Sequence, residues 1–326
     1  MKQTTANAMS LRAKINNYAK EHGILAQVVL QNYMFECLLD RISRSKYVDN
    51  FVIKGGILVS SLVGLDVRST MDMDTTLVHL SLTEEKIKEA MNAIIAVPAD
   101  DGVVFNFVSV EPIRKDDVYG GFCLRLDAKY ESIETPLSID ISTGDVITPE
   151  PMNYGYKRLF NSENVIPLRS YPLETVLAEK IETIITRGIL NTRPRDFYDV
   201  YILTKTQEYN AETLCKAIFA TAEHRGTKAI MEAETNNRLA VIENSSELQS
   251  QWAKYQKKFP YAKDITYQET VNCYDYSDEE LAQFVPIIKA AGREGKKVQM
   301  YFNNHPNGCG AKNGLKLKEM VAEDFL

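Results

Sequence analysis

The sequence predicts a mixed α/β (α+β) protein with helices at its start, short strands in its middle and a helical C-terminal half. Three changes of pattern support this fold class. Residues 10–46 space their apolar side chains at the three- and four-residue intervals of a helix. Residues 51–142 contain short runs rich in β-branched residues, and helical spacing returns near residue 160.

Two helices are expected at the N-terminus, within "SLRAKINNYAKEHGILAQVVLQNYMFECLLDRISRSK". The apolar spacing continues through this segment, but Gly23 interrupts it. A glycine inside a helical pattern marks a weak point or an end. The break between the two helices is therefore expected near Gly23.

The middle segment is predicted to form strands with one helix between them. The expected strands are "FVIKGG", "DMDTTL", "VVFNFVSVEPI", "GFCLRLDAKY" and "LSIDIS", and the expected helix is "LTEEKIKEAMNAIIA". The turn-rich stretch "TGDVITPEPMNYGY" then leads to helices in "PLETVLAEKIETIITRGIL" and "RDFYDVYILTK". We expect two domains, residues 1–160 and residues 161–326.

Composition narrows the class of protein. The 326 residues are 44% hydrophobic and 25% charged, which is ordinary for a globular protein and unlike a disordered one. No run of 18 apolar residues is present, so we expect no membrane segment and a cytoplasmic protein. The five scattered cysteines predict reduced thiols rather than a disulfide framework. A net charge of −6 means that any nucleic acid must bind a local basic patch.

Two aspartates one residue apart, Asp72 and Asp74, lie in one of the expected strands. Residues i and i+2 of a strand project from the same face, about 7 Å apart. Two carboxylates so placed repel each other, and a divalent cation relieves the repulsion. Standing alone, such a pair is more often a solvated strand face. Here the preceding strand, glycine pair and helix favour a metal site, and oxygen ligands favour Mg²⁺.

Three further features of the sequence fit such a site. Asp140 alternates with apolar residues in "PLSIDIS", and a neighbouring strand position would bring it to the pair as a third ligand. Gly55 and Gly56 lie between a strand and a helix, where backbone amides can approach a triphosphate. Arg68 lies just before the aspartates and would add positive charge.

A lysine in the middle of an apolar helix face is the second signal. In "LETVLAEKIETIITRG", Lys180 falls among apolar side chains at helical spacing. Such a lysine either extends to the surface or is held as a point charge for a phosphate. The following "NTRPRDFYDVY" supplies Asp196 and Asp199, which makes a functional charged cluster plausible.

Taken together and in this order, "KGG", "RSTMDMD", "SIDIS", "LAEKIETI" and "RPRDFYDVY" resemble the AbiEii-type nucleotidyltransferases, toxins of the abortive-infection type IV toxin–antitoxin systems. The motifs span residues 51–201. The resemblance implies a polymerase-β-like nucleotidyltransferase core, Mg²⁺ and a nucleoside triphosphate substrate. It also implies growth inhibition by nucleotide transfer onto an RNA acceptor, the 3′ end of tRNA. It also implies a neighbouring antitoxin that need not contact the toxin.

Residue by residue, the resemblance assigns the glycine pair to Gly55 and Gly56 and the metal pair to Asp72 and Asp74. It assigns the helical lysine to Lys180 and the later aspartate to Asp196 or Asp199. The family commonly has Ser or Thr directly after the glycine pair, whereas this chain has Ile57, with Ser60 and Ser61 further on.

An RNA acceptor requires basic and aromatic side chains for phosphates and bases. The candidates are Lys157, Arg158, Arg187, Arg193, Arg195, the stretches "KYQKKF" and "REGKK", and Tyr154, Tyr156 and Tyr198. Two other readings stay open. The same carboxylates would serve transfer to a protein or small molecule, and a non-catalytic nucleotide- or partner-binding module would not need them for its effect.

Overall fold

The structure is a computed structural model that describes residues 5–81, 83–113, 121–271, 278–295, 298 and 309–323. It contains two compact units, Met1–Pro172 and Leu173–Leu326. We expected the division at residue 160. The first unit extends beyond that residue because the strand Val165–Ser170 pairs within its sheet.

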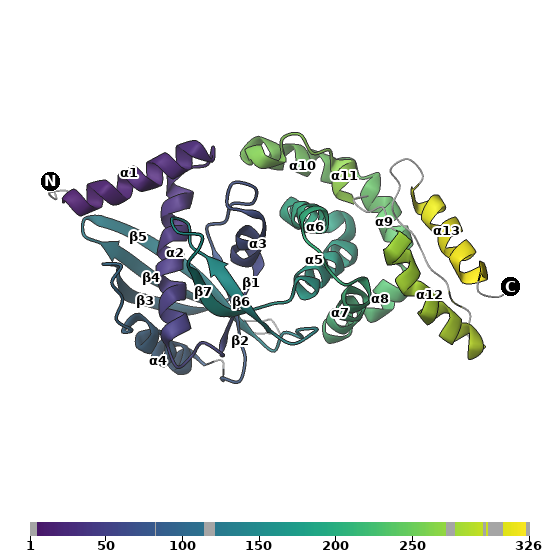
Figure 1. Cartoon of the computed structure of the whole chain (residues 1–326), viewed down its shortest axis with the longest axis horizontal. Coiled ribbons are helices and arrows are strands. Elements are labelled where there is room, and N and C mark those ends of the chain that lie inside the picture. Colours follow the sequence, from purple (N-terminus) through teal and green to yellow (C-terminus); the bar gives the residue numbers. More distant parts are fainter. Residues whose placement is uncertain are drawn as a thin grey trace. The chain divides into compact units, whose positions relative to one another are not determined.

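The first unit combines helices with one mixed sheet (Figure 1). The elements in chain order are α1 (Ala6–Glu21), α2 (Ala26–Arg44), β1 (Phe51–Lys54), α3 (Gly55–Val63), β2 (Met73–Leu77), α4 (Glu84–Ile95), β3 (Val104–Ile113), β4 (Gly121–Tyr130), β5 (Ile133–Thr143), β6 (Met152–Lys157) and β7 (Val165–Ser170).

The sheet has seven strands in the order β3-β4-β5-β2-β1-β7-β6. The β2–β5 and β1–β7 pairs are parallel and the other neighbours are antiparallel. This order places β2 and β5 side by side in the middle of the sheet, although many residues separate them in the chain. Because the two strands are parallel, β2 lies along the second half of β5, and its first residues meet Ile139 and Asp140.

Most of the predicted elements are confirmed. The N-terminal helices separate at Gly23, which has a positive φ of 65°. The five expected strands correspond to β1–β5 and the expected helix to α4. Strands β6 and β7 were missed, because Pro151 and Pro167 and the glycine in "MNYGYK" obscure their pattern. Proline is tolerated close to a sheet edge, and β6 is the edge strand.

Helix α2 is the main support of the sheet. It packs against β5 and β7 and also contacts α1 and α4. Met34, Phe35, Leu38 and Leu39 are all fully buried. Burial of large apolar side chains of this kind stabilises a fold by about 1.5–3 kcal/mol each. The sheet that carries the aspartates therefore lies on a tightly packed layer.

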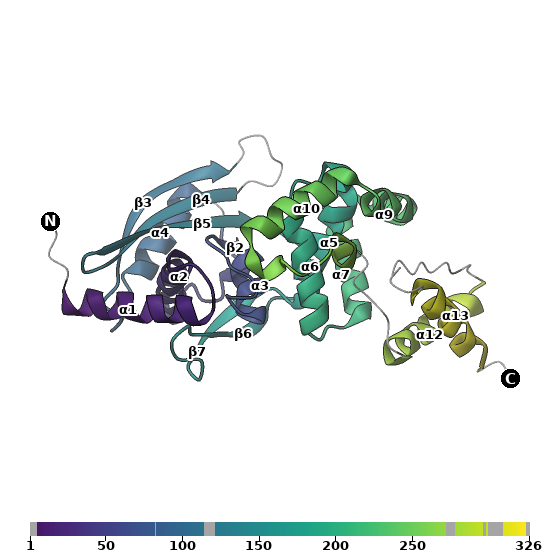
Figure 2. The same cartoon turned by 90° about the horizontal axis from the view of Figure 1, so that it is seen from above.

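The second unit is helical, as predicted. Its elements are α5 (Leu173–Arg187), η1 (Gly188–Leu190), α6 (Pro194–Thr206), α7 (Ala211–His224), α8 (Lys228–Ala233), α9 (Thr235–Glu243), α10 (Ser246–Lys258), η2 (Pro260–Ala262), α11 (Tyr267–Val271), α12 (Asp278–Arg293) and α13 (Cys309–Glu323). Helix α5 packs against α6 and α7, and α12 packs against α13 (Figure 2).

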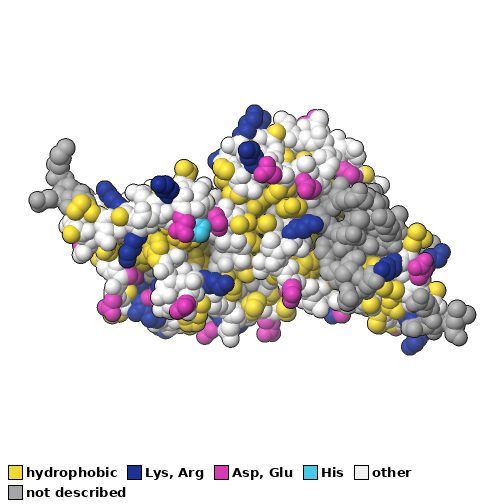
Figure 3. All heavy atoms as spheres, turned by 45° about the horizontal axis from the view of Figure 1, so that its top comes forward, with side chains coloured by type: hydrophobic (Ala, Val, Ile, Leu, Met, Phe, Trp, Pro, Cys, Tyr) yellow, Lys and Arg dark blue, Asp and Glu magenta, His cyan; other side chains and the backbone are white. Residues whose placement is uncertain are grey.

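Aromatic side chains form much of the packing between α6 and α10. Tyr198 of α6 is buried, and its ring lies 4.9 Å from Tyr261 and 6.0 Å from Tyr255. Trp252 is also buried and donates from Nε1 to the Ile265 carbonyl at 2.9 Å. The surface around α10 carries basic, acidic and apolar side chains close together (Figure 3).

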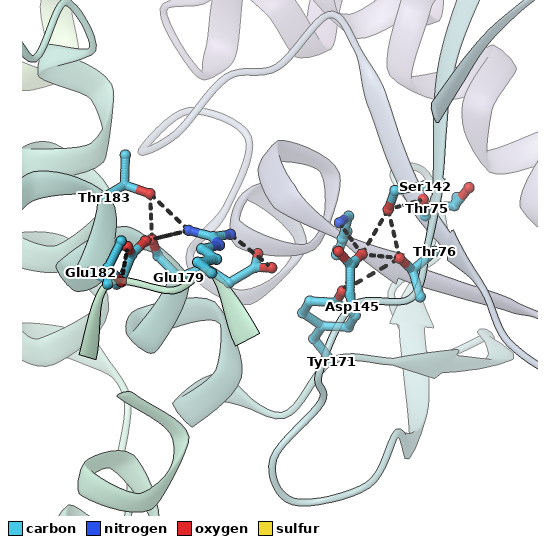
Figure 4. A network of polar contacts seen from close by, with 11 residues as sticks. Thr75, Thr76, Ser142, Asp145, Tyr171, Glu179, Glu182 and Thr183 are labelled. Carbon is cyan, nitrogen blue, oxygen red and sulfur yellow. Dashed lines mark hydrogen bonds and ion pairs between the residues drawn. The ribbon is translucent and has the colours of Figure 1, made fainter. Parts of the chain in front are cut away.

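A buried carboxylate joins α5 to the turn after α7 (Figure 4). Glu182 is 2% exposed and accepts from Arg225 Nη1 at 2.5 Å and from Thr227 Oγ1 at 2.8 Å. These contacts satisfy a charge that burial would otherwise penalise. No helix in the described part of the chain has the length and apolar character needed to cross a membrane.

Candidate active site

The aspartate pair lies at the start of β2. Asp72 is exposed and directly precedes the strand, Asp74 is half-buried within it, and Met73 between them is fully buried. At residues 72–74 the burial alternates as expected for a strand that covers the Met73 side, whereas Thr75, Thr76 and Leu77 further along are all buried. Both carboxylates therefore project from the face opposite to Met73, as the spacing predicted.

Asp140 lies on β5, directly beside Asp74. The parallel register pairs Asp74 with Asp140, and the fully buried Ile139 and Ile141 flank Asp140 on its own strand. Its side chain thus shares the face of the aspartate pair. The structure brings this third carboxylate to the place that the alternation in "PLSIDIS" predicted.

The glycine pair is the tight turn from β1 into α3. Gly55 has a φ of 57°, and a Cβ atom there would lie 2.1 Å from Asp74 Oδ2. The backbone N–H of Gly56 donates to the same oxygen at 3.1 Å. Only glycine permits both the left-handed backbone and this close approach. The Asp74 carboxylate thereby occupies the positive N-terminal end of α3.

Arg68 lies beneath this turn instead of being open to solvent. It is 1% exposed, and its Nη1 donates to the Ser69 carbonyl at 2.7 Å. A Cβ atom on Gly56 would lie 3.5 Å from Arg68 Nη2 and 2.6 Å from Thr70 Oγ1. The predicted positive charge is therefore close to the glycine turn but enclosed.

The residues after the glycine pair offer no free hydroxyl in place of the family's Ser or Thr. Ile57 is fully buried. Ser60 is buried and donates to the Ile57 carbonyl at 3.0 Å, and Ser61 Oγ lies 2.7 Å from Tyr154 Oη. Phosphate contacts from this turn would have to come from its backbone amides.

The three carboxylates influence one another electrostatically. Burial raises the pKa of Asp140, and the charges of Asp74 and Asp72 raise it further, against a hydrogen bond with Cys123 that lowers it. A bound cation would relieve this repulsion. Within the described residues, no three acidic, histidine or cysteine side chains already converge closely enough to form a metal centre. The donor chemistry fits Mg²⁺, but binding would have to draw the carboxylates together.

A polar network beside this site was not predicted from the sequence. Asp145, in the loop after β5, accepts from Lys54 Nζ at 2.6 Å, Ser142 Oγ at 2.7 Å and Tyr171 Oη at 2.9 Å (Figure 4). Thr76 Oγ1 also donates to it. The network joins the ends of β1, β2, β5 and β7, so it fixes the strand that leads into the glycine turn. The only signal in the sequence is a Ser-Thr-Gly-Asp turn after a strand.

In the second unit, Lys180 lies between two aspartates of α6. Its Nζ is 2.7 Å from Asp199 Oδ2 and 3.1 Å from Asp196 Oδ1. The Asp199 side chain is fully buried, whereas those of Lys180 and Asp196 retain 13% and 12% exposure. The lysine is thus held by α6, and the sequence predicted the cluster but not which carboxylate anchors it.

Comparison with protein families decides the relationship. The model described as "Nucleotidyl transferase AbiEii toxin, Type IV TA system" matches residues 37–273, more than half of the chain. The chain belongs to the AbiEii family. The predicted relationship is confirmed, and with it the predicted class of nucleotidyltransferase toxin.

The similar solved structures share little sequence with this AbiEii protein. A candidate nucleotidyltransferase from Helicobacter pylori is 17% identical, covers 73% of this chain and 98% of its own, and has a TM-score of 0.40. A second Helicobacter pylori structure has 17% identity, 73% and 95% coverage and a TM-score of 0.39. An antigenic nucleotidyltransferase-like protein from Paracoccidioides brasiliensis has 15% identity, 70% and 89% coverage and a TM-score of 0.30. No curated protein matches the chain significantly.

Several residues expected to contact RNA in this AbiEii protein are buried or paired with other residues of the protein. Tyr156 and Tyr198 are 4% and 1% exposed, so their rings are not available for stacking on bases. Arg158 pairs with Asp40 and with Glu36. Arg187 and Arg193 are exposed, and Arg195 is half-buried. The stretch "REGKK" lies partly outside the described residues.

Proposed function

We propose that this AbiEii protein transfers a nucleoside monophosphate from a nucleoside triphosphate to an RNA acceptor, the 3′ end of tRNA, and thereby inhibits growth. The observation that carries the proposal is the register of Asp74 beside Asp140, next to the glycine turn, in a chain of a nucleotidyltransferase family. A neighbouring antitoxin would counteract the toxin without an obligatory contact between the two proteins.

Asp72, Asp74 and Asp140 would hold Mg²⁺. When bound, such a cation neutralises phosphate charge and lowers the pKa of an attacking hydroxyl group. The proposed task of the three carboxylates is to orient the α-phosphate and the acceptor hydroxyl on one face of the sheet.

The backbone of the glycine turn supplies the other part of the site. The N-terminal end of α3 is the positive end of the helix dipole, and its backbone amides are the proposed donors to phosphate oxygens beside the Asp74 carboxylate. The Gly56 N–H donates to the Asp74 carboxylate at 3.1 Å, which places the carboxylate beside these amides. The enclosed Arg68 charge supports this turn from below. Lys180, anchored by Asp199 and Asp196, is the proposed cation for the β- and γ-phosphates.

The test is transfer of label from each α-labelled nucleoside triphosphate to total tRNA in the presence of Mg²⁺. The native protein is expected to label RNA, and Asp72→Ala and Asp74→Ala are expected to lose at least a hundredfold in rate. Asp127→Ala is the matched control, because Asp127 is an exposed strand aspartate of the same sheet. The control should retain native activity.

The other outcomes identify the competing functions. If label appears on the protein or on a small molecule and RNA stays unlabelled, that molecule is the acceptor instead of RNA. If Asp72→Ala inhibits growth as strongly as the native protein, growth inhibition does not require nucleotide transfer. Full transfer activity in Asp74→Ala would refute the assigned site.

A further inference from the structure

A group of half-buried aromatic rings and exposed cations lies at the end of α10 in the second unit. We call it the α10 platform and define it by Phe259, Tyr261, Lys254, Lys257, Lys258, Lys263 and Arg195. We propose that the α10 platform binds a single-stranded segment of RNA, with bases against the rings and phosphates on the cations. RNA binding at the platform does not depend on the proposed function. Only the role of the bound RNA as the acceptor rests on it.

The rings of the α10 platform are ordered by packing beneath them. Phe259 lies 4.6 Å from the buried Tyr255 and 5.4 Å from Tyr261, with the latter pair stacked at an interplanar angle of 28°. Tyr261 Oη is 2.9 Å from Tyr255 Oη. Both Phe259 and Tyr261 remain partly exposed. The platform therefore holds two partly exposed rings in fixed positions, and aromatic rings are a usual means of holding unstacked bases.

The segment after α10 is held to the helix by one side chain. The Gln256 Nε2 atom lies 3.1, 2.9 and 3.0 Å from the carbonyl oxygens of Ala262, Lys263 and Ile265. These contacts fix the chain around Tyr261 in place. Binding to the platform would therefore cost little ordering of the protein.

Cations surround the rings. Lys258 Nζ and Arg195 Cζ lie over the Phe259 ring, 5.3 and 5.7 Å from its centre, so a base that stacks on this ring would displace one of these side chains. Lys254, Lys257, Lys258 and Lys263 are exposed, and no acidic residue occurs from 248 to 263. Among the described residues, no carboxylate forms an ion pair with these four lysines. This stretch is therefore locally basic in a chain with a net charge of −6, with the exposed Glu247 and Asp264 at its two ends.

Stacked rings distinguish RNA from other acidic partners. An acidic protein or a simple polyanion would use the lysines but gain little from Phe259. In a duplex the bases are already stacked on each other, so their faces are not available. The arrangement therefore favours single strands.

The test measures binding of a fluorescent single-stranded RNA oligonucleotide to the full-length protein by anisotropy, over a series of NaCl concentrations. Three variants are compared with the native chain. They are Phe259→Leu, the double variant Lys257→Gln/Lys258→Gln and the control Lys216→Gln/Lys228→Gln. The control removes the same charge from two exposed lysines of the same unit that pair with glutamates. Thermal melting confirms that each variant is folded.

The platform predicts a different result for each variant. Phe259→Leu should weaken binding about tenfold with an unchanged salt slope, because one stacking contact is lost. The Lys257 and Lys258 double variant should weaken binding and reduce the log–log salt slope by about 1.4. The control should bind as the native chain does. Heparin, a polyanion without bases, should respond to the lysine variant but not to Phe259→Leu.

The following results would overturn the inference: no RNA binding by the native chain, equal losses in the lysine variant and its control, or no effect of Phe259→Leu on RNA with the variant folded. If that variant does not fold, the comparison of the two lysine variants decides. Binding at the platform without RNA labelling would refute the proposed function alone. RNA labelling with unchanged affinity in all platform variants would refute the platform alone.

Discussion

Gly55 is the residue on which the position of the Asp74 carboxylate most directly depends. Its φ is positive, and a Cβ atom on it would lie 2.1 Å from Asp74 Oδ2, so any larger residue would require movement of the turn. Gly23 has a similar φ of 65° but open space around it. The two glycines therefore separate the cost of backbone strain from the cost of displacing a site residue.

Gly23→Ala and Gly55→Ala should thus lose similar stability through backbone strain but differ in transfer activity. Each alanine in the left-handed region costs about 1–2 kcal/mol of stability. Only Gly55→Ala should also reduce nucleotide transfer, by at least tenfold, because it displaces Asp74. Chemical denaturation and initial rates measure the two effects. Equal activity in both variants would contradict the role given to the turn.

The carboxylate cluster predicts a specific response to Mg²⁺. With EDTA, Asp140→Asn should be at least as stable as the native chain, since it removes one of three mutually repelling charges. With Mg²⁺ at about ten times its Kd, the native melting temperature should rise by about 2–4 °C. The rise should be smaller in Asp140→Asn. If Mg²⁺ raises the melting temperature of this variant as much as that of the native chain, Asp140 is not a ligand of the cation.

At the scale of elements, the Asp145 network links four strands through one charge. Burial alone would raise the pKa of Asp145, but the Lys54 ammonium and the hydrogen bonds from Lys54, Thr76 and Ser142 hold it well below its usual value. A carboxylate with a depressed folded-state pKa contributes stability above its unfolded pKa. That stability is lost as the pH falls toward the folded-state pKa.

Asp145→Asn should therefore destabilise the protein by about 3 kcal/mol at pH 7, because the half-buried Lys54 loses the carboxylate it contacts. The difference from the native chain should shrink as the pH falls below about 4. Glu89→Gln is the control. It breaks the exposed Lys86–Glu89 pair and should leave the stability close to that of the native chain, because solvent screens such a pair. A pH-independent difference for Asp145→Asn would contradict the assigned charge interaction.

Helices α5 and α6 are joined by the Lys180 cluster, and stability and activity can be separated there. Lys180→Met leaves Asp196 and the buried Asp199 without this cation and should cost about 3 kcal/mol. Adding Asp199→Asn should restore part of the stability because it removes the buried charge. If Lys180 contacts phosphate, the double variant should stay inactive in the transfer assay. Recovered activity would reduce Lys180 to a structural residue.

Local patterns predicted the parts of the fold that depend on sequence neighbours. Strand alternation placed Asp72, Asp74 and Asp140 on one face, because the two-residue period is a local property. The Asp145 network was missed because its partners come from four strands, and no local pattern indicates that they meet. The burial of Tyr198 and Arg68 was missed for the same reason, since tertiary packing decides whether a polar or aromatic side chain is covered.

At the scale of the whole molecule, net charge and local charge act in opposite directions on an RNA acceptor. The chain carries −6 overall, with a pI of about 5.5, and so repels a polyanion at long range. The α10 platform provides five cations at short range. Added salt weakens both the long-range repulsion and the short-range attraction. If RNA binds at the platform, the short-range contacts dominate the salt dependence, because each of them releases a counterion.

Transfer onto tRNA at subsaturating acceptor should therefore fall steeply with salt. If all five platform cations contact phosphates of a single strand, the log–log slope is about −3.5, or about a hundredfold loss between 50 and 200 mM NaCl. The Lys257→Gln/Lys258→Gln variant should show a shallower slope and a raised KM for tRNA at an unchanged kcat. Initial rates at saturating nucleoside triphosphate and Mg²⁺ measure all three quantities. A slope near zero would instead indicate an acceptor that the protein recognises without phosphate contacts.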